Sequence, residues 1–145
     1  MSKQEEIHDN PTRWVRKHIR SYVETEGRSG HKWNGVRTLL LTTRGRQTGK
    51  LRRTALIYGE DKGRYVVVGS RGGHQYHPNW YLNLVENPEV QVQVGAEIFD
   101  ARAYTAQGEE RARLWSVMAE IWPDYAKYAK KTEREIPVIV LELID

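Results

Sequence analysis

The sequence Val-Gln-Val-Gln-Val at residues 90–94 alternates strictly between apolar and polar side chains. Because successive side chains of a strand point to opposite faces of a sheet, this alternation predicts a strand with one buried face. Gly95-Ala96 then leads into a second predicted strand at residues 97–104. The two segments are expected to pair as a hairpin, which is a unit of antiparallel sheet.

Other segments extend this pattern. Strands are predicted at 36–43, 54–59, 65–70 and 136–143, and helices at 11–26, 78–86, 108–121 and 124–131. The strands at 54–59 and 65–70 flank the turn-forming residues 60–63, so we expect them to be antiparallel neighbours. Helices inserted between hairpins favour an α+β fold with a mainly antiparallel sheet, which at 145 residues usually closes into a barrel.

The length is that of one domain. We expect a polar N-terminal tail at 1–10 and a single domain over 11–145 that begins with the helix at 11–26. No apolar run approaches the roughly 20 residues of a membrane span, and no secretory signal is recognisable, so we expect a cytoplasmic protein. The helix at 11–26 carries a basic face that is either solvated or in peripheral contact with the inner membrane face: Arg13, Arg16, Lys17 and Arg20.

The segment from Gly27 to Gly59 contains no acidic residue but many basic ones: Arg28, Lys32, Arg37, Arg44, Arg46, Lys50, Arg52 and Arg53. Such a block indicates an anionic ligand. The chain also has no cysteine, which excludes disulfides, iron–sulfur clusters, thiolate zinc sites and thiol nucleophiles. Redox chemistry would therefore need a bound organic cofactor or a metal on other ligands.

Two loops combine glycine, arginine and hydroxyl side chains, at residues 42–53 and 69–73. Glycine lets backbone N–H groups converge on an anion, and arginine donates paired hydrogen bonds to phosphate or carboxylate. The first loop is not a Walker motif, because Leu51 follows Gly49-Lys50. We expect both loops to face one cleft, although a solvated basic hairpin and a nucleic-acid contact are alternatives for the first.

Aromatic residues gather in two further places. Residues 74–84 are dense in flat rings and lead into a helix, whose N-terminus also favours an anion. His74 and His77 have no nearby carboxylate to complete a metal site, so none is predicted. Tyr125 and Tyr128 share a helical face close to Trp122, which indicates either core packing or a lid over an aromatic ligand.

Together these segments resemble the deazaflavin-dependent nitroreductase family, which includes F420H2-dependent quinone reductases. The resemblance covers residues 38–142 and rests on Thr-Thr-Arg-Gly-Arg-Gln-Thr-Gly at 42–49, Gly-Ser-Arg-Gly-Gly at 69–73, Pro-Asn-Trp-Tyr-Leu-Asn-Leu at 78–84, Asn-Pro-Glu-Val-Gln-Val-Gln at 87–93 and Trp-Pro-Asp-Tyr at 122–125. It implies a split β-barrel similar to flavin-mononucleotide-binding barrels, coenzyme F420 as cofactor, and hydride transfer to a quinone or nitroaromatic acceptor.

The resemblance also implies site residues. The phosphate and oligoglutamate tail of F420 would be held by Arg46, Thr48, Gly49, Lys50 and Arg52. The phosphate and the ring side would be lined by Ser70, Arg71, Gly72 and Gly73, and the deazaflavin would pack on Pro78, Asn79, Trp80 and Tyr81. The acceptor would be covered by Trp122, Tyr125 and Tyr128, with Ser70 or Tyr125 donating a hydrogen bond or proton to it.

Three positions depart from the commonest family pattern: Gln47, Ile57 and Trp122. These departures leave cofactor affinity and acceptor choice open. Two alternatives remain at this stage, a flavin-mononucleotide-dependent oxidoreductase on the same barrel and a non-catalytic protein that stores F420. Binding of nucleic acid is not expected, and the oligomeric state is not predicted.

Overall fold

A computed structural model describes residues 5–144 of the chain. In chain order the elements are β1 (Ile7–Asp9), α1 (Arg13–Glu24), β2 (Lys32–Trp33), β3 (Val36–Arg44), β4 (Leu51–Ile57), β5 (Gly59–Asp61), β6 (Arg64–Val68), the short 3-10 helix η1 (Arg71–Gly73), α2 (Asn79–Glu86), β7 (Glu89–Val94), β8 (Glu97–Thr105), α3 (Gly108–Ile121), α4 (Asp124–Lys130) and β9 (Val138–Leu143).

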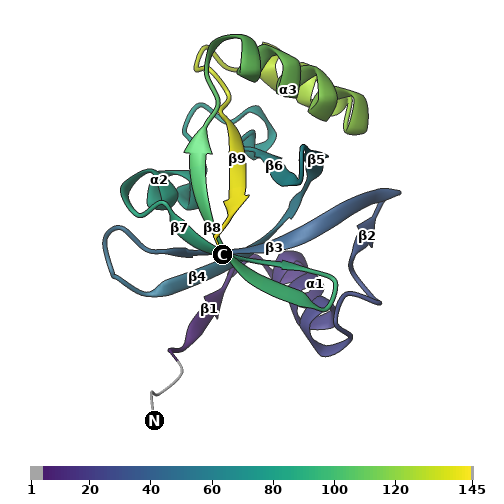
Figure 1. The fold of residues 1–145 in the computed structure, drawn as a ribbon, viewed down its shortest axis with the longest axis vertical. Coiled ribbons are helices and arrows are strands. Elements are labelled where there is room, and N and C mark those ends of the chain that lie inside the picture. Colours follow the sequence, from purple (N-terminus) through teal and green to yellow (C-terminus); the bar gives the residue numbers. More distant parts are fainter. Residues whose placement is uncertain (1–4, 145) are drawn as a thin grey trace.

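The strands of the described residues form one sheet in the order β1-β4-β3-β7-β8-β9-β6-β5, and β2 pairs with β3 beside it. Every pairing is antiparallel except that of β1 with β4. Figure 1 shows β8 and β9 running across the direction of β3 and β4, so the sheet curls on itself with helices outside it. The predicted α+β split barrel with a mainly antiparallel sheet is confirmed.

The central strands are buried on both faces. Because successive side chains of a strand point to opposite faces, neighbouring residues then belong to different cores. Ile139 and Leu141 of β9 lie in the main core inside the curl, while Val138 and Val140 face α3. This double burial explains why the C-terminal strand is almost wholly apolar in sequence. Leu40 of β3 likewise points outward, away from the main core.

Helix α1 covers the outer side of β3 and is fixed there by Tyr22. The fully buried Tyr22 hydroxyl donates to the carbonyl of Thr38 at 3.0 Å and accepts from the N–H of Gly95 at 2.8 Å. Gly27 follows the helix at φ 84°, and a Cβ there would lie 2.6 Å from the Cα of Gly95. Only glycine allows the chain to leave the helix so close to the β7–β8 turn.

The predicted pairing of strand 54–59 with strand 65–70 is only partly correct. The segment is divided: β4 pairs along its length with β3, and only the three residues of β5 pair with β6. The division falls at Tyr58, whose side chain is buried and whose N–H donates to the carbonyl of Arg37 at 3.2 Å. The cationic loop at 44–50 is therefore the turn of a β3–β4 hairpin.

The polar N-terminal segment is not a tail at residues 7–9, which corrects the prediction for 1–10. Residues 7–9 form β1, which pairs in parallel with β4. Asp9 Oδ1 accepts from Arg53 Nε at 2.6 Å, and the N–H of Asn10 donates to the carbonyl of Arg53 at 2.8 Å. The rest of the predicted tail includes residues 1–4, which lie outside the described part. Between residues 5 and 144, no helix combines the length and apolar character needed to cross a membrane.

Candidate functional site

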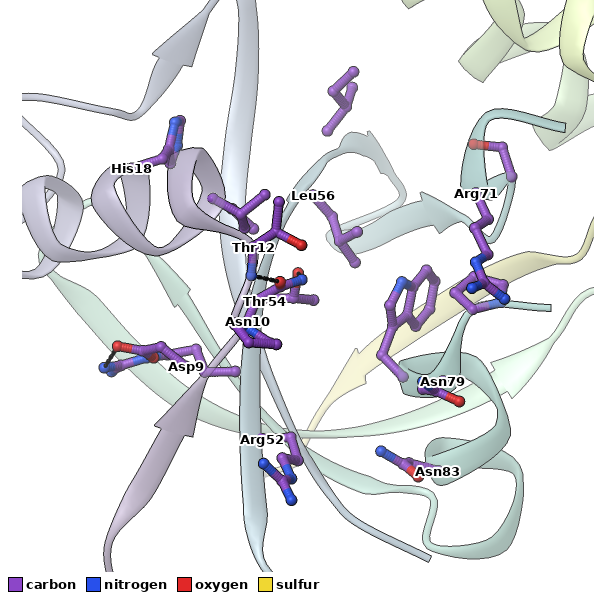
Figure 2. Close-up of a pocket in the computed structure, with 18 of the residues that line it drawn as sticks. Asp9, Asn10, Thr12, His18, Arg52, Thr54, Leu56, Arg71, Asn79 and Asn83 are labelled. Atoms are coloured by element: carbon purple, nitrogen blue, oxygen red, sulfur yellow. Dashed lines mark hydrogen bonds and ion pairs between the residues drawn. The ribbon is translucent and has the colours of Figure 1, made fainter. Parts of the chain in front are cut away.

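A cavity of about 830 Å³ opens beside β4. Figure 2 places Asp9, Thr12 and Arg52 on its β1–α1–β4 side, and Arg71 and Asn79 on the side of η1 and α2. The volume lies within the roughly 300–1,000 Å³ of typical small-molecule sites. Residues of both Gly/Arg loops line the cavity, so the expectation that the two loops share one cleft is confirmed.

Most of the residues that the sequence singled out line this cavity: Arg46, Thr48, Arg52, Ser70, Arg71, Gly72, Pro78, Asn79, Trp80, Trp122, Tyr125 and Tyr128. The two further family departures, Gln47 and Ile57, line it as well. Residues far apart in sequence therefore converge, because the β3–β4 hairpin, the loop after β6, α2 and α4 all border the same space.

Four of the predicted site residues do not line the cavity. Two of them, Gly49 and Lys50, form hydrogen bonds that close the turn of the β3–β4 hairpin. The N–H of Gly49 donates to the carbonyl of Gly45 at 2.8 Å. The N–H of Lys50 donates to Thr48 Oγ1 at 3.2 Å, and the carbonyl of Lys50 accepts from the N–H of Gly45 at 2.7 Å. Their backbones shape the loop that carries Arg46.

The other two lie behind the cavity wall. Tyr81 shares a hydrogen bond of 3.0 Å between its hydroxyl and Thr105 Oγ1 and so ties α2 to β8. Gly73 is buried against α4, where a Cβ would lie 2.7 Å from the carbonyl oxygen of Tyr128. Its lack of a side chain allows α4 to approach the loop closely.

The cavity has a cationic end. Arg46, Arg52 and Arg71 line it, and within residues 5–144 none of these guanidiniums lies within 4.0 Å of a carboxylate. Their neighbours differ, because Arg53 pairs with Asp9 and Arg44 pairs with Glu5 at 2.6 Å each. Three uncompensated cations around one space are suited to bind an anion.

Asn83 of α2 orients one of these cations. Its Oδ1 accepts from both the N–H and Nη1 of Arg46, at 3.1 and 3.0 Å, and its Nδ2 donates to Thr43 Oγ1 at 3.3 Å. The side chain is buried, so the contact is shielded from water. Asn83 belongs to the Pro-Asn-Trp-Tyr-Leu-Asn-Leu motif, but no role was predicted for it from the sequence.

A second part of the cavity lining, called the aromatic end below, is formed by aromatic rings. Trp33 stacks on Trp14 with a centroid distance of 5.9 Å and an interplanar angle of 18°, and lies 5.4 Å from Trp122. The ring centroids of Tyr125 and Tyr128 lie 6.2 Å apart, and all five of these rings line the cavity. Neither Trp14 nor Trp33 was predicted as a site residue from the sequence, and a two-residue strand such as β2 carries no recognisable pattern.

Two of the lining residues, Ser70 and Tyr125, carry hydroxyl groups. Burial, followed by the proximity of Tyr128, raises the pKa of Tyr125 above its ordinary value, so its hydroxyl stays protonated at neutral pH. Ser70 is also largely buried. In the described part of the chain neither hydroxyl is hydrogen-bonded to a protein atom, so both are able to donate to a ligand.

The split barrel and its cavity, which combines arginines that lack carboxylate partners with aromatic rings, define a class of proteins suited to hold an organic cofactor with an anionic tail. Within this class the sequence matches the family described as F420H(2)-dependent quinone reductase over residues 14–143. The chain belongs to this family, which confirms the resemblance found in the sequence.

Individual relatives agree with this assignment. An F420H(2)-dependent quinone reductase of Mycobacterium tuberculosis is 37% identical, over 90% of this chain and 96% of the relative. A solved F420-H2-dependent reductase, FDR-A, is 42% identical with a TM-score of 0.67, over 72% of this chain and 93% of that structure. A second solved structure, described as a domain-swapped dimer, is 39% identical with a TM-score of 0.71, over 92% and 100%.

Family membership identifies the chain as an F420H2-dependent oxidoreductase. Coenzyme F420 is the cofactor that the family requires, and the alternative of flavin mononucleotide is not needed.

Proposed function

We propose that the cavity binds F420H2 at its cationic end and a quinone at its aromatic end, and that the protein promotes hydride transfer between them. The observation that carries the proposal is the union in one cavity of three uncompensated arginines with a wall of five aromatic rings. A tail of phosphate and carboxylates matches the first feature and a flat quinone ring matches the second.

The residues present fit the cofactor. Arg46, Arg52 and Arg71 would neutralise the phosphate and carboxylates, and the Thr48 hydroxyl would add a neutral donor beside them. Trp80, which lines the cavity from the first turn of α2, would supply the flat surface on which the ring packs.

At the aromatic end the protein's task is to place the acceptor and to stabilise the charge that develops on it. When bound, F420H2 supplies the hydride. Trp33, Trp122 and Tyr128 would hold the acceptor ring and exclude water, and the hydroxyl of Ser70 or Tyr125 would donate a hydrogen bond or proton to the reduced oxygen. Full turnover in Ser70→Ala, Tyr125→Phe and the double variant would disprove this role for the hydroxyls.

Cofactor binding can be followed by intrinsic fluorescence. Four of the five tryptophans line the cavity, namely Trp14, Trp33, Trp80 and Trp122, so a bound chromophore lies near most of the emission. Oxidised F420 is expected to quench saturably, and flavin mononucleotide serves as the parallel control. Quenching by flavin mononucleotide alone would refute the cofactor assignment.

Acceptor choice is tested with F420H2 under single-turnover conditions, using a quinone and a nitroaromatic compound of similar ring size. Faster oxidation by the quinone supports the proposal, while oxidation only by the nitroaromatic compound would replace the quinone as acceptor. Tight F420 binding without turnover of either would indicate storage in place of catalysis.

We also propose that α1 makes peripheral contact with an anionic membrane surface. All four basic residues of its outer face are exposed, and Trp14, at the aromatic end of the cavity, is 59% exposed. Lipophilic quinones would then reach the cavity from the membrane side. Salt-sensitive co-sedimentation with anionic vesicles, absent with zwitterionic vesicles and in an Arg16→Glu/Arg20→Glu variant, is the expected result; equal sedimentation of both proteins would rule this contact out.

A further inference from the structure

Arg134 lies outside the cavity, between α4 and β9, but its guanidinium reaches the loop at 69–77. Nε donates to the carbonyl of His74 at 2.8 Å, Nη1 to that of Gly69 at 3.2 Å, and Nη2 to that of Ser70 at 2.8 Å. One side chain thus fixes carbonyl groups at both ends of the η1 turn.

A fourth contact joins the same guanidinium to His77. Arg134 Nη1 lies 3.0 Å from His77 Nδ1, and because a guanidinium only donates, Nδ1 must accept and the ring must be neutral. Burial, followed by the charge of Arg134, lowers the pKa of His77, which agrees with a neutral ring. The ring centroid of His77 lies 5.0 Å from that of Tyr81, which belongs to α2. Arg134 therefore also connects the loop to the start of α2.

The η1 turn needs such support because its backbone is strained. Arg71 adopts φ 46°, a left-handed conformation that costs a non-glycine residue about 1–2 kcal/mol. Gly72 and Gly73 follow at φ 61° and 83°, so three consecutive residues are left-handed. Strain of this kind persists only where the surroundings hold it in place. The carbonyls bound by Arg134 bracket these three residues.

The positive charge of Arg134 also bears on anion binding by the loop. Within residues 5–144 no carboxylate lies within 4.0 Å of the Arg134 guanidinium, whereas Arg111, on α3, pairs with Glu135 at 3.2 Å. Arg71 lies near enough for its charge to lower the pKa of Arg134, after the larger effect of burial. An anion bound to Arg71 would relieve the repulsion between these two cations, so the loop is arranged to favour a bound anion.

We propose that Arg134 is a positioning residue for the cofactor: it holds the turn at 70–73 in the conformation that presents the Ser70 hydroxyl and the Arg71 guanidinium to the cavity, without touching the cofactor itself. The proposal rests on the proposed role of residues 70–72 in F420 binding. Lysine cannot replace Arg134, because a single ammonium does not span four acceptors that a planar guanidinium reaches together.

The first test needs no ligand. Hydrogen exchange of the unliganded protein should show faster exchange in Arg134→Ala at the amides of 70–77, with the strands unchanged, and a smaller increase in Arg134→Lys. Arg102→Ala is the matched control, because the Arg102 side chain is 63% exposed and pairs with the exposed Glu89. Wild-type exchange at 70–77 in Arg134→Ala would overturn the proposal.

The second test is F420 titration. Arg134→Ala should weaken binding on the order of tenfold, through the ordering of the loop that binding would then require. The KM for F420H2 should rise while kcat and the KM for the quinone change little. Millimolar ethylguanidinium, which matches the atoms removed from the side chain, should restore binding to Arg134→Ala. Unchanged affinity, or failure of rescue in Arg134→Ala protein whose strands keep wild-type hydrogen exchange, would refute the role of Arg134.

F420 binding and the positioning role of Arg134 can be refuted separately. If wild-type protein does not bind F420, the proposed function is wrong whatever Arg134 does. If wild-type protein binds F420 and Arg71→Ala weakens binding while Arg134→Ala does not, the site is correct and the positioning role is wrong.

Discussion

Replacement of Asn83 by alanine tests the link between the buried polar contacts of α2 and the cationic end of the cavity. The change removes the acceptor of two Arg46 N–H groups and the donor to Thr43. Arg46 is partly exposed, so its guanidinium can turn towards water. The backbone N–H of Arg46, however, loses its partner at a buried position, because Asn83 is only 5% exposed. Leaving such a group unpaired costs about 1–3 kcal/mol.

The free energy of unfolding, measured by urea denaturation, should therefore fall by about 1–3 kcal/mol in Asn83→Ala. F420 binding should weaken by about twofold to tenfold, because immobilising a freed arginine on binding costs about 0.5–1.5 kcal/mol. Gln91→Ala, which removes an exposed amide on β7, is the control and should change stability by less than about 0.5 kcal/mol.

Asn83→Asp separates geometry from charge. The carboxylate still accepts from Arg46, so stability should fall less than in the alanine variant, but it neutralises one of the three free cations and should weaken F420 binding more. The reasoning is refuted if Asn83→Ala unfolds at the wild-type urea concentration, or if Asn83→Asp binds F420 more tightly than Asn83→Ala.

Three further changes test the fold and its response to pH. Tyr22→Phe leaves the buried carbonyl of Thr38 and the partly buried N–H of Gly95 without this partner and should lower the free energy of unfolding by about 1–3 kcal/mol in urea; an unchanged midpoint would contradict this. Arg113 is the main cause of the low pKa of Asp61, about 2 against 3.8, so the stability from this contact is present above pH 3.8 and lost as pH falls towards 2. Asp61→Asn should flatten the acid limb of the stability profile in that window. The pKa of His77 in the folded protein lies below its ordinary 6.5. The stability that comes from its neutral ring is therefore present above pH 6.5 and is lost as pH falls through the folded pKa. Arg134→Ala removes a neighbouring positive charge and should move the pKa of His77 upward in an NMR titration.

Long, regular elements could be predicted from the sequence because their pattern is local. The alternation at 90–94 and the turn at 95–96 correctly predicted the β7–β8 hairpin, in which Val94 pairs with Glu97. The helix predicted at 108–121 coincides with α3, and those predicted at 78–86 and 124–131 each differ from α2 and α4 by one residue.

Elements that depend on distant partners could not be predicted. Three residues of β1 are too few to show alternation, and the strand exists because Asp9 and Asn10 bond to Arg53 across 44 and 43 positions of sequence. The candidate site divides in the same way. Most of the site residues that the glycine, arginine and aromatic motifs indicated do line the cavity, while Trp33 and Arg134 act through contacts that only the folded chain creates.

The place of β9 in the sheet has a consequence for synthesis of the protein. The last strand of the chain pairs with β8 on one side and β6 on the other, so it is an inner strand and not an edge. During synthesis, β6 and β8 therefore expose unpaired edges until β9 has been made and has left the ribosome. Removal of residues 138–143 would open the sheet in its middle, so a variant without β9 should not complete this fold.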